Sequence, residues 1–422
     1  MLHSYSKFLT FAKPLSILNM HHILIFMSVL ILGSIGHLAT DIYLPSMPSM
    51  AEYFDTSNTL VQFTLSAYML SFCFTPLIIG PLSDKIGRKR PILLGILIGL
   101  VATFLCIFST NIYFLVFGRF LQGIGLGIVV CVSRAILPDR FQGKDLAKYY
   151  SILTMFMPVV LAIGPSLGAF IHEYSSWHGV FIFLASYLVV IVFLTYYLFQ
   201  DKEKSEKINS AELKTVFHVY KDLLSNKKFL LFTLCSVFIF IGISAYLTVW
   251  SFLFQERLGL TPRQSAATSL ITFTAIFAMG YLNIRLMSFF KPKKLLYLVN
   301  PFILASGILL IFCDMTNNIN IYTLIFSVTL YFCALPVTFA NANSLAFASI
   351  QGNFGAAVAL LSCIQFLSGG VASAIISFTD SKSVIPLGMT FMLVGIGTFI
   401  LLLLEGQVKK PHSESTAVVG SV

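Results

Sequence analysis

Long runs of apolar residues, separated by short polar segments, recur along the whole chain. A membrane-spanning helix needs about 20 apolar residues, and the pattern predicts twelve such spans. The first six lie at residues 22–46, 59–82, 91–108, 112–137, 148–171 and 178–199, and the second six at 229–254, 262–285, 295–313, 320–344, 354–378 and 386–404. We therefore expect an all-α membrane protein that crosses the bilayer twelve times.

One long polar stretch separates the spans into two sets of six. It predicts a division into an N-terminal bundle, a cytoplasmic linker with an amphipathic turn, a C-terminal bundle and a cytoplasmic tail, at residues 1–199, 200–228, 229–404 and 405–422. Gly80 and Gly280 each begin a G-x-L sequence followed by a basic segment, and they stand 200 residues apart. Such an echo predicts two six-helix halves related by a pseudo-two-fold axis, with a binding site between them near mid-membrane.

Composition and charge support this reading. Hydrophobic residues make up 57% of the 422 residues and charged residues 10%, whereas soluble domains carry about 25% charged residues. A net charge of +10 is compatible with nucleic-acid binding or with a basic cytoplasmic membrane face. With a cytoplasmic N-terminus, 23 of the 27 Lys and Arg residues fall on the inner side and three on the outer side. The positive-inside rule therefore predicts that both termini are cytoplasmic and that the charge does not serve nucleic-acid binding.

The connection between spans two and three carries the most specific motif, at residues 80–91. Gly80 and Gly87 permit tight bends, Asp84 can bond a helix N-terminus, and the basic residues favour the anionic inner leaflet. The segment resembles motif A of the major facilitator superfamily, and the resemblance covers all twelve spans. It implies an inner gate in which Asp84 contacts the start of span eleven near residues 352–353 when the protein opens outward. The predicted inner-gate residues are Gly80, Asp84, Gly87, Arg88, Lys89, Arg90, Arg134 and Asp139. The alternative is that the charged members of this set are solvated and serve only to orient the chain in the membrane.

Three further segments agree with this family. Residues 119–125 resemble motif B, and residues 38–45 resemble the bicyclomycin- and chloramphenicol-resistance type of drug:proton antiporter. Residues 164–169 resemble the end of motif C of the antiporter branch, through Gly164, Pro165 and Gly168. Ala169 replaces a terminal glycine of that motif, and ordinary close helix packing is the alternative explanation.

Asp41 and Arg119 are the two charged side chains predicted within spans. Buried charges in a membrane are costly and therefore mark functional sites by default. At about 1.5 Å per residue they lie about 8 Å and about 10 Å below the outer ends of spans one and four. We expect them to face each other as a titratable pair for proton coupling, with an architectural ion pair as the alternative. His37 precedes Asp41 by one helical turn and is expected to line the proton route or to pack as an ordinary histidine.

Candidates for the substrate cavity share only a polar or aromatic character and a plausible depth. They are Tyr68, Tyr246, Trp250, Asn341, Asn343 and Gln365. An apolar cavity with a few polar contacts and one acid suits lipophilic compounds that are neutral or weakly cationic. The seven cysteines form no C-x-x-C pair, which argues against a zinc site or a disulfide framework.

The sequence contains no phosphate-binding loop, H-E-x-x-H or G-x-S-x-G motif, so we expect neither an enzyme nor a cofactor. The resemblance implies a monomeric exporter in a bacterial inner membrane that exchanges small lipophilic drugs for protons, with the proton gradient as its energy source. Export of an endogenous metabolite or siderophore on the same fold is the first alternative. An uptake symporter is a second, and a non-transporting sensor or intramembrane enzyme is a third.

Overall fold

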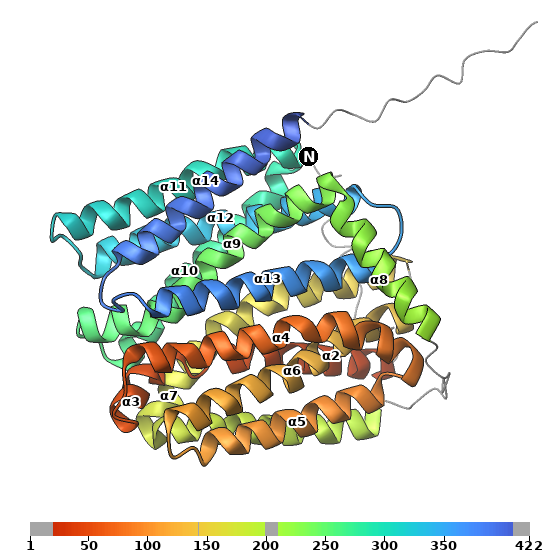
Figure 1. The fold of residues 1–422 in the computed structure, drawn as a ribbon, viewed down its shortest axis with the longest axis horizontal. Coiled ribbons are helices and arrows are strands. Elements are labelled where there is room, and N and C mark those ends of the chain that lie inside the picture. The colour runs from red at the N-terminus through yellow and green to blue at the C-terminus, as the bar shows by residue number, and fades with distance from the viewer. Residues whose placement is uncertain (1–19, 142, 199–209, 408–422) are drawn as a thin grey trace, which may run out of the picture.

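The computed structural model describes residues 20–141, 143–198 and 210–407, and every regular element in these ranges is helical (Figure 1). Outside the described residues lie 1–19 and 408–422, which we predicted to be cytoplasmic, and 199–209, which includes the first part of the predicted linker. The elements are α2 Met20–Asp41, η3 Leu44–Ser46, α3 Met47–Tyr53, α4 Asn58–Ile86, α5 Lys89–Ile107, α6 Ile112–Arg140, α7 Gly143–Leu198, α8 Ser210–Ser225, α9 Lys227–Phe252, η4 Leu253–Arg257, α10 Pro262–Leu286, α11 Pro292–Met315, α12 Ile321–Ala348, α13 Phe354–Ser377 and α14 Ile385–Gln407.

Eleven helices in the described ranges are long and apolar enough to cross a membrane, against twelve predicted spans. The difference lies in α7, which joins the predicted spans five and six across a break at Ser176, with φ 72° and ψ 179°. The 56 residues of α7 would measure about 84 Å as one helix at about 1.5 Å per residue. A hydrocarbon core is only about 30 Å thick, so α7 consists of two membrane passes that turn at Ser176.

The predicted first span, 22–46, overlaps a candidate span of Ile23–Tyr53 but is not one regular helix, because α2 stops at Asp41. Pro45 lies four residues after Asp41 and has no N–H to donate to the Asp41 carbonyl group, so a regular helix cannot continue. The chain turns at Ile42 and Tyr43 and then forms the short helices η3 and α3. The acidic side chain predicted within a helix therefore stands at a helix end that is buried inside the protein.

The predicted linker contains more structure than the single amphipathic turn we expected. Its described part forms the helix α8, of 16 residues. Leu223 on α8 is buried against α9 residues such as Phe229 and Phe232, and Tyr220 donates a hydrogen bond to the Leu77 carbonyl oxygen of α4 at 3.3 Å. Pro81 cannot supply the helical partner of that carbonyl group, so α8 satisfies an acceptor that α4 leaves open.

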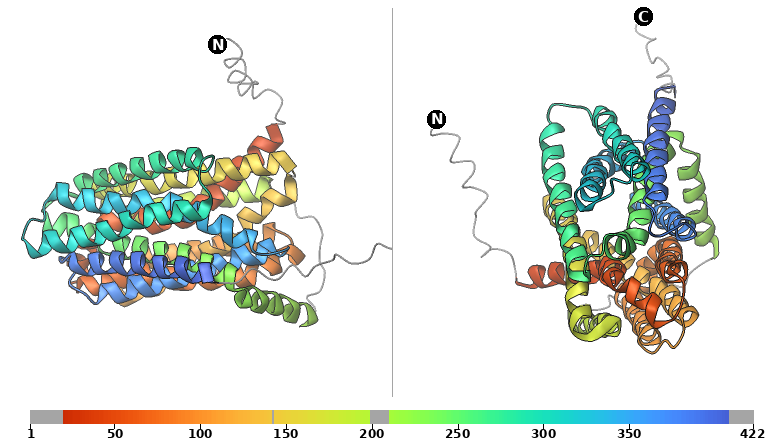
Figure 2. Two further views of the ribbon diagram at one scale, coloured as in Figure 1. Left: turned by 90° about the horizontal axis from the view of Figure 1, so that it is seen from above. Right: turned by 90° about the vertical axis from the view of Figure 1, so that its left-hand side faces the viewer.

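The long helices run side by side along one axis (Figures 1 and 2). In Figure 1, α2 to α7 occupy the lower part and α9 to α14 the upper part, and α13 packs against α4 between them. A second contact joins α7 to α10. We call the end of the molecule with the α4–α5 connection, on the right in Figure 1, the basic end, and the end with α3 and η4 the opposite end.

Candidate functional site

Asp41 and Arg119 lie in one buried polar cluster between α2, α4 and α6. Their exposed fractions are 2% and 0%. The guanidinium group of Arg119 donates to the carbonyl oxygen of Ala39 at 3.1 Å and to Oε1 of Gln122 at 2.5 Å. The first bond reaches the backbone two residues before Asp41, so the structure places both charged residues at the same depth.

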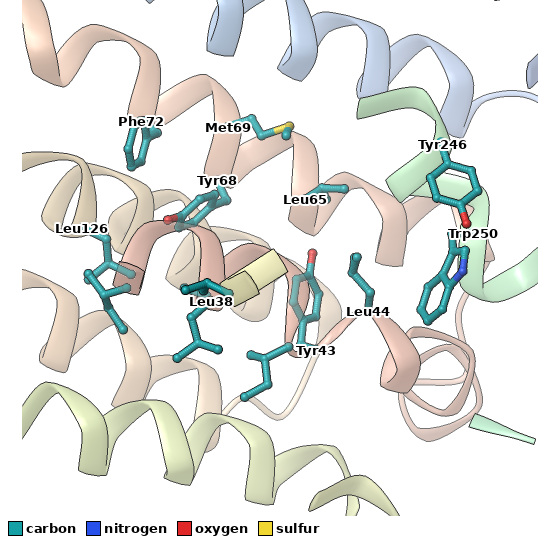
Figure 3. Packing of buried hydrophobic residues seen from close by; sticks show 14 of the residues in the cluster. Leu38, Tyr43, Leu44, Leu65, Tyr68, Met69, Phe72, Leu126, Tyr246 and Trp250 are labelled. Atoms are coloured by element: carbon teal, nitrogen blue, oxygen red, sulfur yellow. The ribbon is translucent and has the colours of Figure 1, made fainter. Parts of the chain in front are cut away.

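Two tyrosine rings enclose the Arg119 guanidinium group. Its carbon lies 4.2 Å from the centre of the Tyr43 ring and 4.6 Å from that of Tyr68. Such cation–π contacts stabilise a desolvated cation by about 2 kcal/mol. The Tyr68 hydroxyl group donates to the Gly36 carbonyl oxygen at 2.9 Å, which fixes one ring, and Figure 3 shows both rings within the packed core. Arg119 is therefore held by aromatic faces and neutral acceptors.

The carboxylate group of Asp41 has no such partners. Neither of its oxygens accepts a hydrogen bond, and among the described residues it forms no ion pair with Arg119. The structure thus brings the two residues together in one cluster without the direct contact that we expected. An ionised carboxylate that is buried without donors is costly, because it is poorly solvated.

The glycines of the motif in α7 close this cluster from a third side. A Cβ atom at Gly164 would lie 3.2 Å from the Cβ of Asp41, and one at Gly168 would overlap the carbonyl oxygen of Ile42. The absence of side chains lets α7 contact the end of α2 directly. Close packing is therefore part of the role of Gly164 and Gly168, and the contact is made at the acidic residue itself.

A cavity of about 610 Å³ lies at the basic end, between α2, α4, α6, α8 and α13. His37 and Phe72 form part of its inner wall, and Asp84 and Arg88 stand at its mouth. From Phe72 to Asp84 the cavity follows α4 for about 18 Å, at about 1.5 Å per residue. His37 is one helical turn from Asp41, so it links the cavity wall to the buried cluster.

The predicted inner-gate residues form a compact network at the mouth. Arg88 contacts Asp84 at 2.5 Å and Asp139 at 2.7 Å, and Lys89 donates to the Tyr196 carbonyl oxygen at 3.0 Å. Partial burial opposes the charge of Arg88, but the two carboxylates outweigh it and raise the Arg88 pKa. Gly87 has φ 87°, a conformation that glycine adopts without strain, and this permits the sharp α4–α5 turn.

The remaining gate residues line the cavity or flank it. Arg134 lies on the cavity wall, as does Gly80 of α4, and Arg90 lies within the first turn of α5. Asn353, at the start of α13, also lines the cavity, but Asp84 contacts Arg88 and not this helix end. The contact of Asp84 with span eleven, which we expect only in an outward-open state, is absent from the described contacts of this conformation.

The opposite end is closed by contacts between the two sets of helices. Asn58 at the start of α4 donates to both carboxylate oxygens of Glu256 in η4, at 3.0 and 3.2 Å. Gln255 donates to the Pro45 carbonyl oxygen at 2.9 Å. Deeper in the molecule, the Ser66 hydroxyl group donates to Ser373 at 2.8 Å. The α4–α13 interface is thus sealed at one end and hollow at the other.

None of the six nominated cavity residues lines this cavity. Tyr68 packs on Arg119, and Asn341 donates to Asn283 and to the Val337 carbonyl oxygen, both at 2.8 Å. Tyr246 and Trp250 are buried on α9 (Figure 3). Gln365 donates to Ser236 at 3.3 Å, and Asn343 is half-buried.

The sequence analysis missed the aromatic residues that do line the cavity, Phe72 and Phe366. Their rings stack at 4.3 Å across the α4–α13 interface. Nothing in the sequence separates them from the other members of a set of 41 phenylalanines. Tyr43 and Gln122 were also missed as contacts of Arg119, although both lie in segments that the motifs had singled out.

Comparisons with known proteins test the family resemblance drawn from the sequence. The family model described as Major Facilitator Superfamily matches residues 29–373. The uncharacterized MFS-type transporter YdgK of Bacillus subtilis is 28% identical over 368 residues, which cover 86% of this chain and 91% of that protein. The chloramphenicol resistance protein CraA of Acinetobacter baumannii is 25% identical over 337 residues, which cover 79% and 81%. These matches confirm the resemblance drawn from the motifs.

A solved structure of similar fold is that of a D-xylose-proton symporter, with a TM-score of 0.73 and 14% identity. The similarity covers 92% of this chain and 98% of that one. At this identity it shows the fold alone. The chain thus has an all-helical fold with many apolar helices, as predicted, and is a multi-pass membrane protein.

Proposed function

Because the chain belongs to the major facilitator superfamily, a family of transporters and not of enzymes, we propose that it exports small lipophilic drugs in exchange for protons. The observation that carries this proposal is the Asp41 carboxylate, which is buried without hydrogen-bond partners in the part of the chain that the structure describes and lies one helical turn from a cavity residue. Similarity to a chloramphenicol resistance protein supports drugs as the substrates and export as the direction.

The proton-coupling site consists of Asp41, Arg119 and His37. His37 faces the cavity and passes a proton along α2 to Asp41. Protonation removes the negative charge of Asp41, while Arg119 stays fixed between Tyr43 and Tyr68. The net charge of the cluster therefore changes by one with each proton, and this change biases the conformations of α2 and α7 that meet at Asp41.

Alternating access follows from the difference between the two ends of the α4–α13 interface. The bundles 1–199 and 229–404 move as two bodies about the binding site. The basic end faces the cytoplasm by the positive-inside rule, with both termini on that side, so the present conformation is inward-open. In the outward-open state the cavity closes, and Asp84 leaves Arg88 to contact the start of α13 near residues 352–353.

The first test is transport itself. The chain is expressed in a bacterial host that lacks its own exporters, and the accumulation of a panel of antibiotics and dyes is measured. We expect lower accumulation of several lipophilic compounds and localisation to the inner membrane. Uptake in place of extrusion would overturn the direction, and extrusion confined to products of the host's own metabolism would favour an endogenous substrate.

The second test addresses the proton. Purified protein is reconstituted in liposomes, and drug transport is measured with and without a pH gradient. We expect Asp41→Asn to abolish the response to the gradient, whereas Asp55→Asn, which changes an exposed acid between α3 and α4, retains it. Undiminished coupling in Asp41→Asn would remove Asp41 from the proposed mechanism.

A third test addresses alternating access. Ser66 and Ser373 are replaced by cysteine in a chain whose seven native cysteines have been removed. Their hydroxyl groups are 2.8 Å apart in this conformation, so we expect an oxidant to link them and to stop transport until a reductant is added. Full transport by the linked protein would contradict the opening of this interface.

A further inference from the structure

The interface between the two bundles has a regular register near its closed, opposite end. Asn58 of α4 donates to Ser381, just beyond α13, at 3.0 Å, and Ser66 of α4 donates to Ser373 of α13 at 2.8 Å. Residues four apart on a helix lie on one face. Gln62 stands midway between Asn58 and Ser66, so it lies on the face of α4 that meets the other bundle, about 6 Å inside the Asn58 contact.

The helix α9 meets this interface at the same level. Thr248 donates to Ser373 at 2.8 Å, and about two turns further on Gln255 donates to a carbonyl oxygen of η3 at 2.9 Å. Ser251 stands between these two residues, about one turn from each. Gln62 and Ser251 therefore occupy one layer of the interface, between an outer and an inner set of contacts.

The polar side chains of this layer are buried and unpaired. Gln62 and Ser251 are 0% exposed, and among the described residues the Gln62 amide group and the Ser251 hydroxyl group have no hydrogen-bond partner. Ser46, the last residue of η3, which packs against α9, is buried in the same way and is also unpaired within the described ranges. Buried amides and hydroxyls in native proteins are nearly always paired, so three unpaired groups in one region indicate a partner that binds in another conformation.

The layer offers hydrogen bonds but no charge. An amide group and a hydroxyl group can each donate and accept. On the outer side, the Glu256 carboxylate already accepts from Asn58 at 3.0 and 3.2 Å and pairs with Lys382 at 3.4 Å. An ion in this layer would lose its hydration without gaining a counter-charge, whereas an uncharged polar group would exchange water for protein partners.

We propose, resting on the export function above, that Gln62, Ser251 and Ser46 form a second binding site, which takes an uncharged amide, hydroxyl or carbonyl group of the exported compound when the opposite end opens. Separation of α4 from α9 and α13 exposes these three side chains to the outer side. The site is distinct from the cavity at the basic end, because none of the three residues lines that cavity.

The first experiment asks whether the layer opens to the outside. Ser251→Cys is introduced into a chain whose seven native cysteines have been replaced, and intact cells are treated with a membrane-impermeant maleimide. Thr338→Cys is the matched control, because the Thr338 hydroxyl group is also buried and unpaired within the described ranges but lies on α12, which packs against α10 and α11. We expect Ser251→Cys to react at least about tenfold faster, and equal rates would overturn the proposal.

The second experiment tests the chemistry of the site with three probes that share one ring system: 2-naphthamide, 2-naphthoate and 2-naphthylmethylammonium. For each probe we measure the concentration that halves the labelling rate of Ser251→Cys in the purified full chain in detergent. We expect 2-naphthamide to protect at a concentration at least about tenfold lower than either ion. Equal protection by an ion, or no protection by the amide, would overturn the proposal.

Variants of Gln62 assign the protection to its side chain. Adding Gln62→Leu to Ser251→Cys should raise the protecting concentration of 2-naphthamide about tenfold without lowering the temperature of unfolding, because leucine replaces an unpaired amide. A packing role would give the reverse, a lower temperature of unfolding with unchanged protection. Thr338→Val is the control and should leave protection unchanged, and a similar loss there would overturn the assignment. Gln62→Met is the second variant if Gln62→Leu does not fold.

The outcomes separate this inference from the proposed function. Protection that depends on Gln62, without export of any compound, would sustain the second site and refute the export function. Export together with protection that is unchanged in Gln62→Leu would sustain export and refute the second site.

Discussion

The helices α2 to α7 and the helices α9 to α14, which we call the N-terminal and the C-terminal bundle, bury their tyrosines in different surroundings. In each, a buried tyrosine donates a hydrogen bond to a carbonyl oxygen of a neighbouring helix: Tyr68 to Gly36 at 2.9 Å, and Tyr331 to Ile239 at 2.7 Å. The ring of Tyr68 then faces the Arg119 guanidinium group, whereas the ring of Tyr331 stacks on Phe391 at 3.8 Å. Tyr68 therefore contacts a cation in the N-terminal bundle, whereas Tyr331 contacts a neutral aromatic ring in the C-terminal bundle.

The two bundles also differ in their buried charges. Among the described residues, the fully buried charged side chains are Asp41 and Arg119, and both lie in the N-terminal bundle. One buried polar pair of the C-terminal bundle, Asn283 and Asn341, is neutral and bonded at 2.8 Å. Neutral amides do not change their charge near neutral pH. We infer that the N-terminal bundle handles the proton and that the C-terminal bundle provides a neutral partner surface.

The largest expected contrast comes from removing the cation. Arg119→Gln removes the charged hydrogen bonds to Ala39 and Gln122, each worth about 1.5–3 kcal/mol, so we expect the free energy of unfolding to fall by roughly 3–6 kcal/mol. Tyr331→Phe removes one neutral bond in the other bundle and should cost about 1 kcal/mol. Denaturant unfolding of both variants in the same detergent measures the difference.

A double variant sharpens this prediction. Arg119→Gln leaves the Asp41 carboxylate without its nearby cation, so adding Asp41→Asn to Arg119→Gln should recover part of the lost stability. Additive losses, or equal losses in Arg119→Gln and Tyr331→Phe, would show that Arg119 and Asp41 do not act as a unit.

A smaller contrast is expected for two glycines. A Cβ atom at Gly168 would overlap the backbone of Ile42, next to Asp41, whereas one at Gly280 in α10 meets only Pro336 at 3.7 Å. We expect Gly168→Ala to destabilise the protein by about 1–3 kcal/mol through overpacking and to impair proton-driven transport. Gly280→Ala should stabilise the helix by about 0.5–1 kcal/mol. Thermal unfolding and liposome transport of both variants provide the test, and normal transport by Gly168→Ala would show that the α2–α7 contact tolerates displacement.

The positions of Asp41 and Arg119 could be predicted from the sequence, whereas the residues that line the cavity could not. Asp41 and Arg119 stand out because ionisable residues are rare and costly within apolar runs, so pattern alone located them at the same depth. The end of α2 at Asp41 was also available from the sequence, since Pro45 follows four residues later. The sequence could not predict that Asp41 and Arg119 make no direct contact among the described residues, because this depends on how the rings of Tyr43 and Tyr68 pack around Arg119.

The cavity wall depends on which faces of α4 and α13 meet. Phe72 and Phe366 are 294 residues apart in the chain, and periodicity cannot align helices so distant. Almost every face of these helices is apolar, so a hydrophobic pattern does not distinguish lipid from cavity or from a partner helix. For the same reason the nominated residues Tyr246 and Trp250 proved to be buried packing residues in this conformation.

The smallest contrast concerns a single hydroxyl group. Thr103 accepts a hydrogen bond from the Gln122 amide at 2.8 Å, and Gln122 in turn accepts from Arg119. Thr103→Val keeps the shape of the side chain but leaves a buried donor unpaired, so we expect a loss of about 1–2 kcal/mol. In the C-terminal bundle, the buried Thr338 hydroxyl group has no hydrogen-bond partner among the described residues, and Thr338→Val should be neutral or stabilising. A loss in Thr338→Val as large as that in Thr103→Val would mean that the polar network around Arg119 adds nothing beyond the packing common to both bundles.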